Sequence, residues 1–318
     1  MASFSASDAA LSGFRFIARH PKTIGIWTLV FLAYELLWGG ALLAFAGDQL
    51  PALRALSQTN GDSAVSAWSV LPGASLVMLL GLLALLFVFS LMFTAAYRTF
   101  LHPHDDRFGY IRLSKDELRF AVLIVLWVVL AVGGSVVVAF FGGLIAALGG
   151  LLAALGGLMP QPLKALWELI VAVAALAAYV YALVRLCFSM PMTLEDRHVR
   201  LLESWKLTRH NFWTLLGVFL LTAVLILVLL LLVCSILAVA LIVTMSAGLP
   251  RSSFLEGLES VLHTDMSSLG AYFSPTSLIA AVLNALIVSV GIAVLTAPVA
   301  EAYMAYSPTQ GGEATTVH

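Results

Sequence analysis

The 318-residue chain is 61% apolar and only 10% charged, and its formal net charge is −1. A soluble domain is roughly 45–50% apolar and about 25% charged, so this composition excludes an ordinary soluble globular protein. The near-zero net charge excludes a chain-wide basic surface of the kind that binds nucleic acid. We therefore expect an all-α, polytopic membrane protein whose first partner is the lipid bilayer.

Apolar segments long enough to cross a bilayer recur along the whole sequence. A transmembrane helix needs about 20 mostly apolar residues, and only a helix satisfies its own backbone within one such segment. Six segments meet this criterion, at about 23–46, 70–97, 120–145, 164–190, 212–246 and 276–304. The sequence therefore predicts a bundle of about six transmembrane helices.

The uncharged run from Phe120 to Leu163 is longer than one perpendicular span and leaves room for a seventh helix. A seventh crossing would place the basic residues 197–209 outside the cell, against the positive-inside rule. We therefore expect a long third helix followed by a re-entrant or interfacial stretch near 146–160. Glycine pairs recur there every seven residues, at 142–143, 149–150 and 156–157. They indicate either a smooth helix face for close packing or a flexible turn.

Lysine and arginine lie mostly on one side of the six predicted spans. Thirteen lie before the first span, between the second and third, or between the fourth and fifth, and three lie on the other side. Because short cytoplasmic loops are enriched in these residues, we expect both termini to be cytoplasmic.

The basic connections have the pattern of amphipathic helices at the membrane surface. Ser114 and Glu117 have the spacing of a capping box, which predicts a helix start that leads into the third span. In residues 197–209, charged side chains recur every three positions and apolar ones lie between them. This pattern predicts an amphipathic helix resting on the headgroups. Residues 4–19 show a weaker version of it.

Similar elements recur three times along the chain. Arg19-His20 and Arg209-His210 each precede an apolar span, and Asp106-Arg107 and Asp196-Arg197 each follow a proline by a few residues. We interpret the chain as one membrane domain of three pseudo-repeated hairpins. The units cover about 1–103, 104–191 and 192–308, and residues 309–318 are expected to be a disordered tail.

Glu35 and Asn284 are the candidate intramembrane polar residues. A charged side chain at the centre of a span costs roughly 2.5–3.5 kcal/mol on insertion scales, so we expect Glu35 to face the bundle interior. It acts there either as a structural hydrogen-bonding group or as a contact for a proton, a cation or a substrate. Asn284, in the last span, predicts an interhelical hydrogen bond.

Six basic residues are candidates for contact with lipid headgroups. Arg98 and Arg185 end the second and fourth spans. Long side chains at this depth extend to the headgroups or turn inward to a carboxylate such as Glu301, and we expect the former. The other four lie in the basic connection between the fourth and fifth spans: Arg197, Arg200, Lys206 and Arg209. Anionic headgroups are the expected partners, since cations near an anionic leaflet are attracted to it.

The sequence carries no standard catalytic signature. H-E-x-x-H, G-x-S-x-G, Walker and G-x-G-x-x-G motifs are all missing. His102, His104, Asp105 and Asp106 form the only cluster of metal-type ligands, but their spacing is not that of a structural zinc site. We therefore predict no catalytic, cofactor-binding or metal-binding residues, and no cofactor.

Two cytoplasmic connections carry a family resemblance. Residues 190–216 read MPMTLEDRHVRLLESWKLTRHNFWTLL, and residues 97–120 read YRTFLHPHDDRFGYIRLSKDELRF. Both segments resemble a bacterial group of uncharacterised six-helix membrane proteins, related to the membrane domain attached to some glycerophosphodiester phosphodiesterases. The resemblance implies a bacterial cytoplasmic membrane protein. It implies no activity, because the catalytic barrel of those phosphodiesterases has no counterpart here.

These observations favour a non-enzymatic membrane component that organises lipids or partner proteins through basic interfacial helices. The alternative is a transporter or permease for a small or lipidic molecule, with Glu35 at its site. An intramembrane enzyme is the third possibility, and it requires polar side chains that converge on a closed cavity.

Overall fold

The computed structural model describes residues 5–47, 72–104, 107–156, 161–209, 211–246, 257 and 264–307. Helices account for the regular structure of this part of the chain, and no strand occurs in it. Six of the helices are long and apolar enough to cross a bilayer: α2 (Pro21–Ala46), α5 (Pro72–Leu101), α6 (Lys115–Gly156), α7 (Gln161–Leu186), α10 (Phe212–Ser246) and α13 (Pro275–Tyr306). The predicted all-α bundle with six spans is confirmed.

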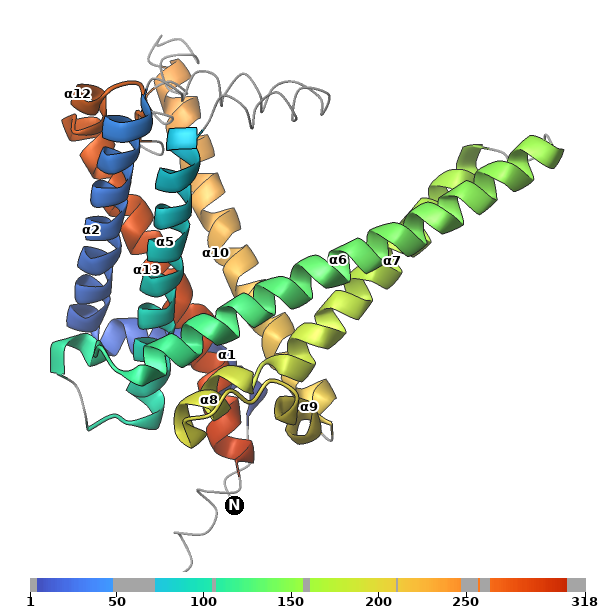
Figure 1. The fold of residues 1–318 in the computed structure, drawn as a ribbon, viewed down its shortest axis with the longest axis horizontal. Coiled ribbons are helices and arrows are strands. Elements are labelled where there is room, and N and C mark those ends of the chain that lie inside the picture. Colours follow the sequence, from blue (N-terminus) through green and yellow to red (C-terminus); the bar gives the residue numbers. More distant parts are fainter. Residues whose placement is uncertain are drawn as a thin grey trace, which may run out of the picture.

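Five shorter elements connect or flank these helices: α1 (Ala6–Arg19), η2 (Arg107–Tyr110), α8 (Ser189–Asp196), α9 (Glu203–Thr208) and α12 (Leu269–Tyr272). Figure 1 shows α1, η2, α8 and α9 gathered at one end of the bundle, and α12 at the other. The first end is called the basic end below, because the segments with most lysines and arginines lie there.

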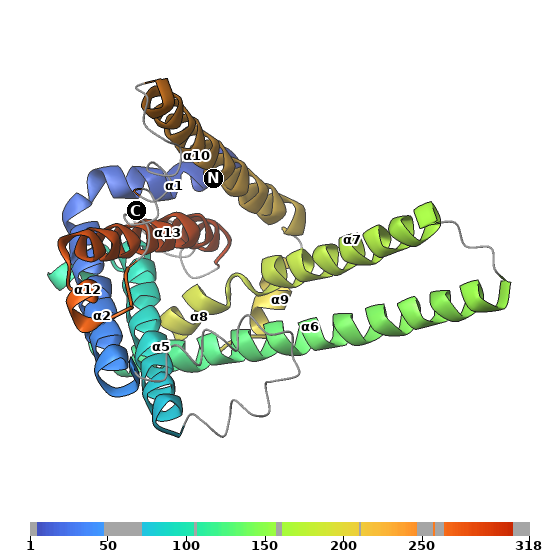
Figure 2. The same cartoon turned by 90° about the horizontal axis from the view of Figure 1, so that it is seen from above.

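Three helices, α2, α5 and α13, stand side by side and form the centre of the bundle (Figures 1 and 2). Trp27, Phe31, Met92 and Ile292 are buried between them. The Trp27 indole N–H donates a hydrogen bond of 2.9 Å to the Gly109 carbonyl, which fastens η2 to α2. The core therefore extends to the basic end, where the short elements are attached.

Helix α1 lies across α13, with which it makes extensive contact. Its buried face is made of small residues and one aromatic ring: Ala9, Ala10, Ser12, Gly13 and Phe16. A Cβ added at Gly13 would lie 2.6 Å from the Val294 Cα, so the two backbones approach closely at this point. The helix predicted in residues 4–19 is present, but its apolar face covers α13 instead of lying free on headgroups.

Helix α6 runs unbroken for 42 residues, which at 1.5 Å per residue is about 63 Å. The predicted stretch near 146–160 therefore makes no re-entrant turn within 146–156, and its interfacial position stays a prediction. Residues 157–160 lie outside the described part. An apolar helix in lipid tolerates glycine pairs without breaking, because its backbone gains nothing by unwinding where water is absent. A Cβ at Gly143 would meet nothing within 4 Å, so this glycine makes no close helix contact.

The α6–α7 pair projects away from α2, α5 and α13 (Figures 1 and 2). Only 11% of the apolar window in α6, and the same share in α10, is buried inside the protein. A helix that is apolar on all sides and largely unburied fits a lipid environment and not water. The exposed sides of these helices are accordingly the lipid-facing surface.

Replacing Gly13 with alanine tests the close contact between α1 and α13. Gly13→Ala is expected to lower the free energy of unfolding by about 1–3 kcal/mol, because the new methyl group overlaps the Val294 backbone. Gly25→Ala in α2 is the control, since its Cβ would meet nothing within 4 Å. That change is expected to be neutral or to stabilise by up to about 1 kcal/mol. Thermal unfolding in one detergent, followed by circular dichroism, measures both; equal Tm values would contradict the contact.

Candidate functional site

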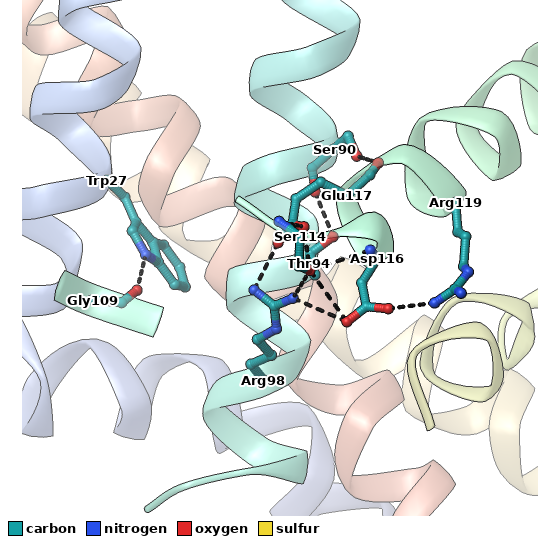
Figure 3. Close-up of polar contacts among 9 residues, drawn as sticks. All are labelled: Trp27, Ser90, Thr94, Arg98, Gly109, Ser114, Asp116, Glu117 and Arg119. Carbon is teal, nitrogen blue, oxygen red and sulfur yellow. Dashed lines mark hydrogen bonds and ion pairs between the residues drawn. The ribbon is translucent and has the colours of Figure 1, made fainter. Parts of the chain in front are cut away.

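A buried ion pair joins the end of α5 to the start of α6 at the basic end (Figure 3). Arg98 Nη1 lies 2.7 Å from Glu117 Oε1, and Arg98 Nη2 lies 3.4 Å from Asp116 Oδ2. The side chains of Arg98 and Glu117 are 9% and 2% exposed. The prediction that Arg98 contacts headgroups is therefore wrong. Its guanidinium turns inward to a carboxylate, and that carboxylate belongs to Glu117 and not to Glu301.

The capping box at the start of α6 holds this carboxylate in place. The Ser114 backbone N–H and hydroxyl both donate to Glu117 Oε2, at 2.7 and 2.6 Å. The Ser90 hydroxyl of α5 donates to the Glu117 backbone carbonyl. The predicted pairing of Ser114 with Glu117 is confirmed, and it leaves Oε1 to face Arg98.

The basic connection after α7 is not a continuous helix. Helix α8 ends at Asp196, Arg197 has a left-handed φ of 56°, and α9 covers only Glu203–Thr208. The predicted single amphipathic helix over 197–209 is therefore wrong. The Arg200 backbone N–H donates to the Thr193 hydroxyl at 3.3 Å, so a side chain there replaces the helical acceptor.

The four basic residues of this connection differ in their surroundings. Arg200 is paired with two carboxylates, Asp196 at 3.2 Å and Glu203 at 2.6 Å. Arg197, Lys206 and Arg209 are exposed. Within the described chain these three make no ion pair. Their contact with headgroups stays a prediction, whereas the charge of Arg200 is already neutralised by the protein.

Arg185, at the end of α7, is enclosed by three aromatic rings. Its guanidinium carbon lies 5.0 Å from the ring centroid of Tyr181, 5.5 Å from that of Trp205 and 5.3 Å from that of Phe212. The residue is 8% exposed, and its Nε and Nη1 atoms are buried without a hydrogen-bond partner. Unlike Arg98, it has no carboxylate partner among the described residues. The rings hold Arg185 as a buried cation, and its contact with a headgroup stays a prediction.

Hydroxyl groups of α9 position one wall of this aromatic cage, which is formed by Tyr181, Trp205 and Phe212. The Ser204 hydroxyl donates to the Arg185 backbone carbonyl at 2.8 Å, and the Thr208 hydroxyl lies 3.2 Å from the same carbonyl. The Ser204 oxygen also accepts a hydrogen bond of 3.1 Å from the Phe188 backbone N–H. These bonds fasten α9 to the end of α7 and place Trp205 against the guanidinium. No local pattern of residues indicates this arrangement, because it joins side chains from α7, α9 and α10.

The two candidate intramembrane residues lie together between α2 and α13. Asn284 Nδ2 is 3.2 Å from both carboxylate oxygens of Glu35, which confirms the interhelical hydrogen bond predicted for Asn284. Glu35 is half-buried and Asn284 is exposed, so the pair lies at the bundle surface and not in its interior as expected. Apolar neighbours occupy the centre of the bundle instead.

Tyr272 of α12 also contacts this region. Its hydroxyl donates a hydrogen bond of 2.6 Å to the Glu35 backbone carbonyl. Burial, together with the nearby Glu35 carboxylate, raises the pKa of Tyr272 to about 12. The phenol therefore stays protonated at neutral pH and keeps its role as donor.

Two apolar grooves open along the spans. One, of about 480 Å³, lies between α6 and α7 and is lined by residues such as Trp127 and Tyr179. The other, of about 490 Å³, lies between α2 and α5 and is lined by residues such as Tyr34 and Trp38. Apolar walls of this kind fit acyl chains better than ions.

No family model matches this chain, and no curated protein or solved structure matches it either. The resemblance to the membrane domain of glycerophosphodiester phosphodiesterases therefore stays a prediction. In the part that the structure describes, no three potential metal ligands come together. Asp105 and Asp106 of the metal-type cluster, and the expected tail at 309–318, lie outside that part.

Glu117→Gln tests the buried ion pair. The change leaves the Arg98 charge buried without a full counter-charge, which is expected to lower the free energy of unfolding by about 3–5 kcal/mol. Glu203→Gln is the matched control, because it neutralises the carboxylate of an exposed arginine pair; a loss below about 1 kcal/mol is expected there. Thermal unfolding in detergent compares the two variants. A loss no larger for Glu117→Gln than for the control would contradict the buried pair.

Proposed function

We propose that this integral membrane protein is a non-enzymatic component of the bacterial cytoplasmic membrane that organises lipids or partner proteins through its basic end. Thirteen of its 16 lysines and arginines lie in segments on that side of the spans. The positive-inside rule then supports an orientation with this end, and both termini, in the cytoplasm.

The observation that carries the proposal is a group of exposed cations beside exposed tryptophans. Arg197, Lys206 and Arg209 are exposed. Trp205 and Trp213 lie in the same segment and are 40% and 79% exposed. Tryptophan prefers the level of the headgroups, and each lysine or arginine near an anionic leaflet contributes about 1 kcal/mol. The group therefore supports attraction of anionic lipids.

The full-length protein in vesicles of mixed phosphatidylglycerol and phosphatidylcholine tests this function. Spin-labelled phosphatidylglycerol is expected to be retained at the protein more strongly than spin-labelled phosphatidylcholine, and the preference should fall as salt is raised. The triple variant Arg197→Gln, Lys206→Gln, Arg209→Gln is expected to lose most of the preference, at about fivefold per charge removed.

Arg200→Gln is the control for this experiment, because Arg200 is already paired with Asp196 and Glu203. Its lipid preference is expected to stay within about twofold of the wild type. Equal retention of the two labelled lipids by the wild type at low salt would overturn the proposal.

The contact between Glu35 and Asn284 favours a second candidate function, a transporter or permease for a small or lipidic molecule. Polar groups from two spans meet there at 3.2 Å, and polar residues inside spans often mark a transport path. The neighbouring groove is apolar and is lined by Tyr34 and Trp38, which favours a lipidic substrate.

Glu35→Gln distinguishes the second function from the first. If the protein moves lipid between leaflets, this variant is expected to abolish the transfer of a fluorescent phospholipid in proteoliposomes while Tm changes little, since glutamine can still bond Asn284. Asn284→Leu is the companion variant, which keeps the carboxyl group but removes its partner. Transfer that continues unchanged in Glu35→Gln would show that Glu35 is only structural.

A further inference from the structure

In the described part of the chain an arginine is buried at the end of two spans, and only one of the two is paired with a carboxylate. Arg98 at the end of α5 lies 2.7 Å from the Glu117 carboxylate. Arg185 at the end of α7 is equally buried, and no carboxylate pairs with it in the described part of the chain. The first arginine shows how this fold neutralises such a charge with its own residues. The second is left without that counter-charge.

The aromatic rings around Arg185 stabilise the cation only in part. The faces of Tyr181, Trp205 and Phe212 lie 5.0–5.5 Å from the guanidinium carbon, within the range of a cation–π interaction. Ring faces do not replace the acceptors that the N–H groups lose on leaving water, and Nε and Nη1 have none. An uncompensated buried charge is costly, so the site is complete only when an anion joins it.

An anion can reach the Arg185 guanidinium at its Nη2 atom. Nε and Nη1 are both enclosed, whereas Nη2 is not among the enclosed atoms. The outer sides of the cage are open, since Tyr181 and Trp205 are 38% and 40% exposed. Tyr181 lies near the end of the apolar helix α7, and Trp205 lies in α9 at the basic end. An anion that reaches Nη2 therefore arrives at the level where tryptophan and tyrosine meet lipid headgroups.

We propose that Arg185 and its three-ring cage bind the phosphate group of a phospholipid headgroup. Phosphate is the anion present at this level of every phospholipid leaflet, and guanidinium forms strong charge-assisted hydrogen bonds with it. The rings hold the guanidinium in one orientation, which lowers the entropy lost on binding. This inference rests on the proposed function, because it names the lipid group that the basic end recognises and the residue that binds it.

The experiment compares three probes on the purified full-length protein in a mild detergent. They are dioctanoylphosphatidylglycerol, dioctanoylglycerol with the same chains but no phosphate, and inorganic phosphate. Each is titrated while Tm is followed. The phosphatidylglycerol is expected to raise Tm of the wild type and of Arg200→Gln at similar concentrations. Arg185→Gln is expected to need at least about ten times more lipid, in line with the loss of one charge-assisted bond.

Two results would overturn the proposal. An equal rise in Tm with dioctanoylglycerol would show that the chains and not the phosphate are recognised, and an unchanged response of Arg185→Gln would place binding elsewhere. A rise with inorganic phosphate at the same concentration as with the lipid would overturn its lipid part, since the site would then take free phosphate.

Tyr181→Glu keeps the proposal testable if Arg185→Gln does not fold. It places a carboxylate four residues before Arg185, the favourable order for an ion pair on a helix. This internal anion is expected to raise Tm without lipid and to abolish the lipid response. A full lipid response in Tyr181→Glu would contradict the site.

Failure of this site is distinguishable from failure of the proposed function. Phosphatidylcholine also carries a phosphate, so dioctanoylphosphatidylcholine is expected to raise Tm through Arg185 as well. If vesicles show no preference for anionic lipid while this response persists, the proposed function fails and the phosphate site stands. If the preference persists while Arg185→Gln responds like the wild type, only the phosphate site fails.

Discussion

The buried ion pair between Arg98 and Glu117 joins α5 to α6 at the basic end, and the position of the α6–α7 pair depends on this junction. Arg98 is brought to Glu117 by the packing of α5 against the first turn of α6. The capping box stabilises that first turn, and the Ser90 hydroxyl donates to the Glu117 backbone carbonyl within it. Because α6 then leaves the bundle and is mostly unburied, this junction is one of the main attachments of the α6–α7 pair.

Charged side chains and apolar grooves lie in different parts of the molecule. The grooves between α6 and α7 and between α2 and α5 have apolar walls, whereas charged side chains collect where α8, α9 and the ends of the spans meet. Such a division suits a protein that crosses a bilayer, since the bilayer has an apolar centre and polar faces. The contact between Glu35 and Asn284 is the exception, and it lies at the bundle surface within the spans.

The residue pattern predicted helix starts well where the partners are close in sequence. Ser114 and Glu117 are three residues apart, and their bonds form within one turn. The pattern gave a wrong prediction in residues 197–209, where charges at every third position indicated one face of a continuous helix. There Arg197 takes a left-handed conformation and Thr193 bonds the Arg200 backbone, so side-chain contacts overrode the helical period. Likewise, nothing local indicated that α6 continues to Gly156.

The sequence by itself determined the class of protein, the number of spans and the side on which the cations gather. These properties depend on the cost of placing backbone and charge in lipid, and that cost is set by composition along each segment. The tertiary structure decided which arginine is paired, which is caged and which cations are exposed. Arg98 and Glu117 are 19 positions apart, and Arg185 and Phe212 are 27 apart. Such contacts depend on how helices pack, and no local pattern of residues encodes that.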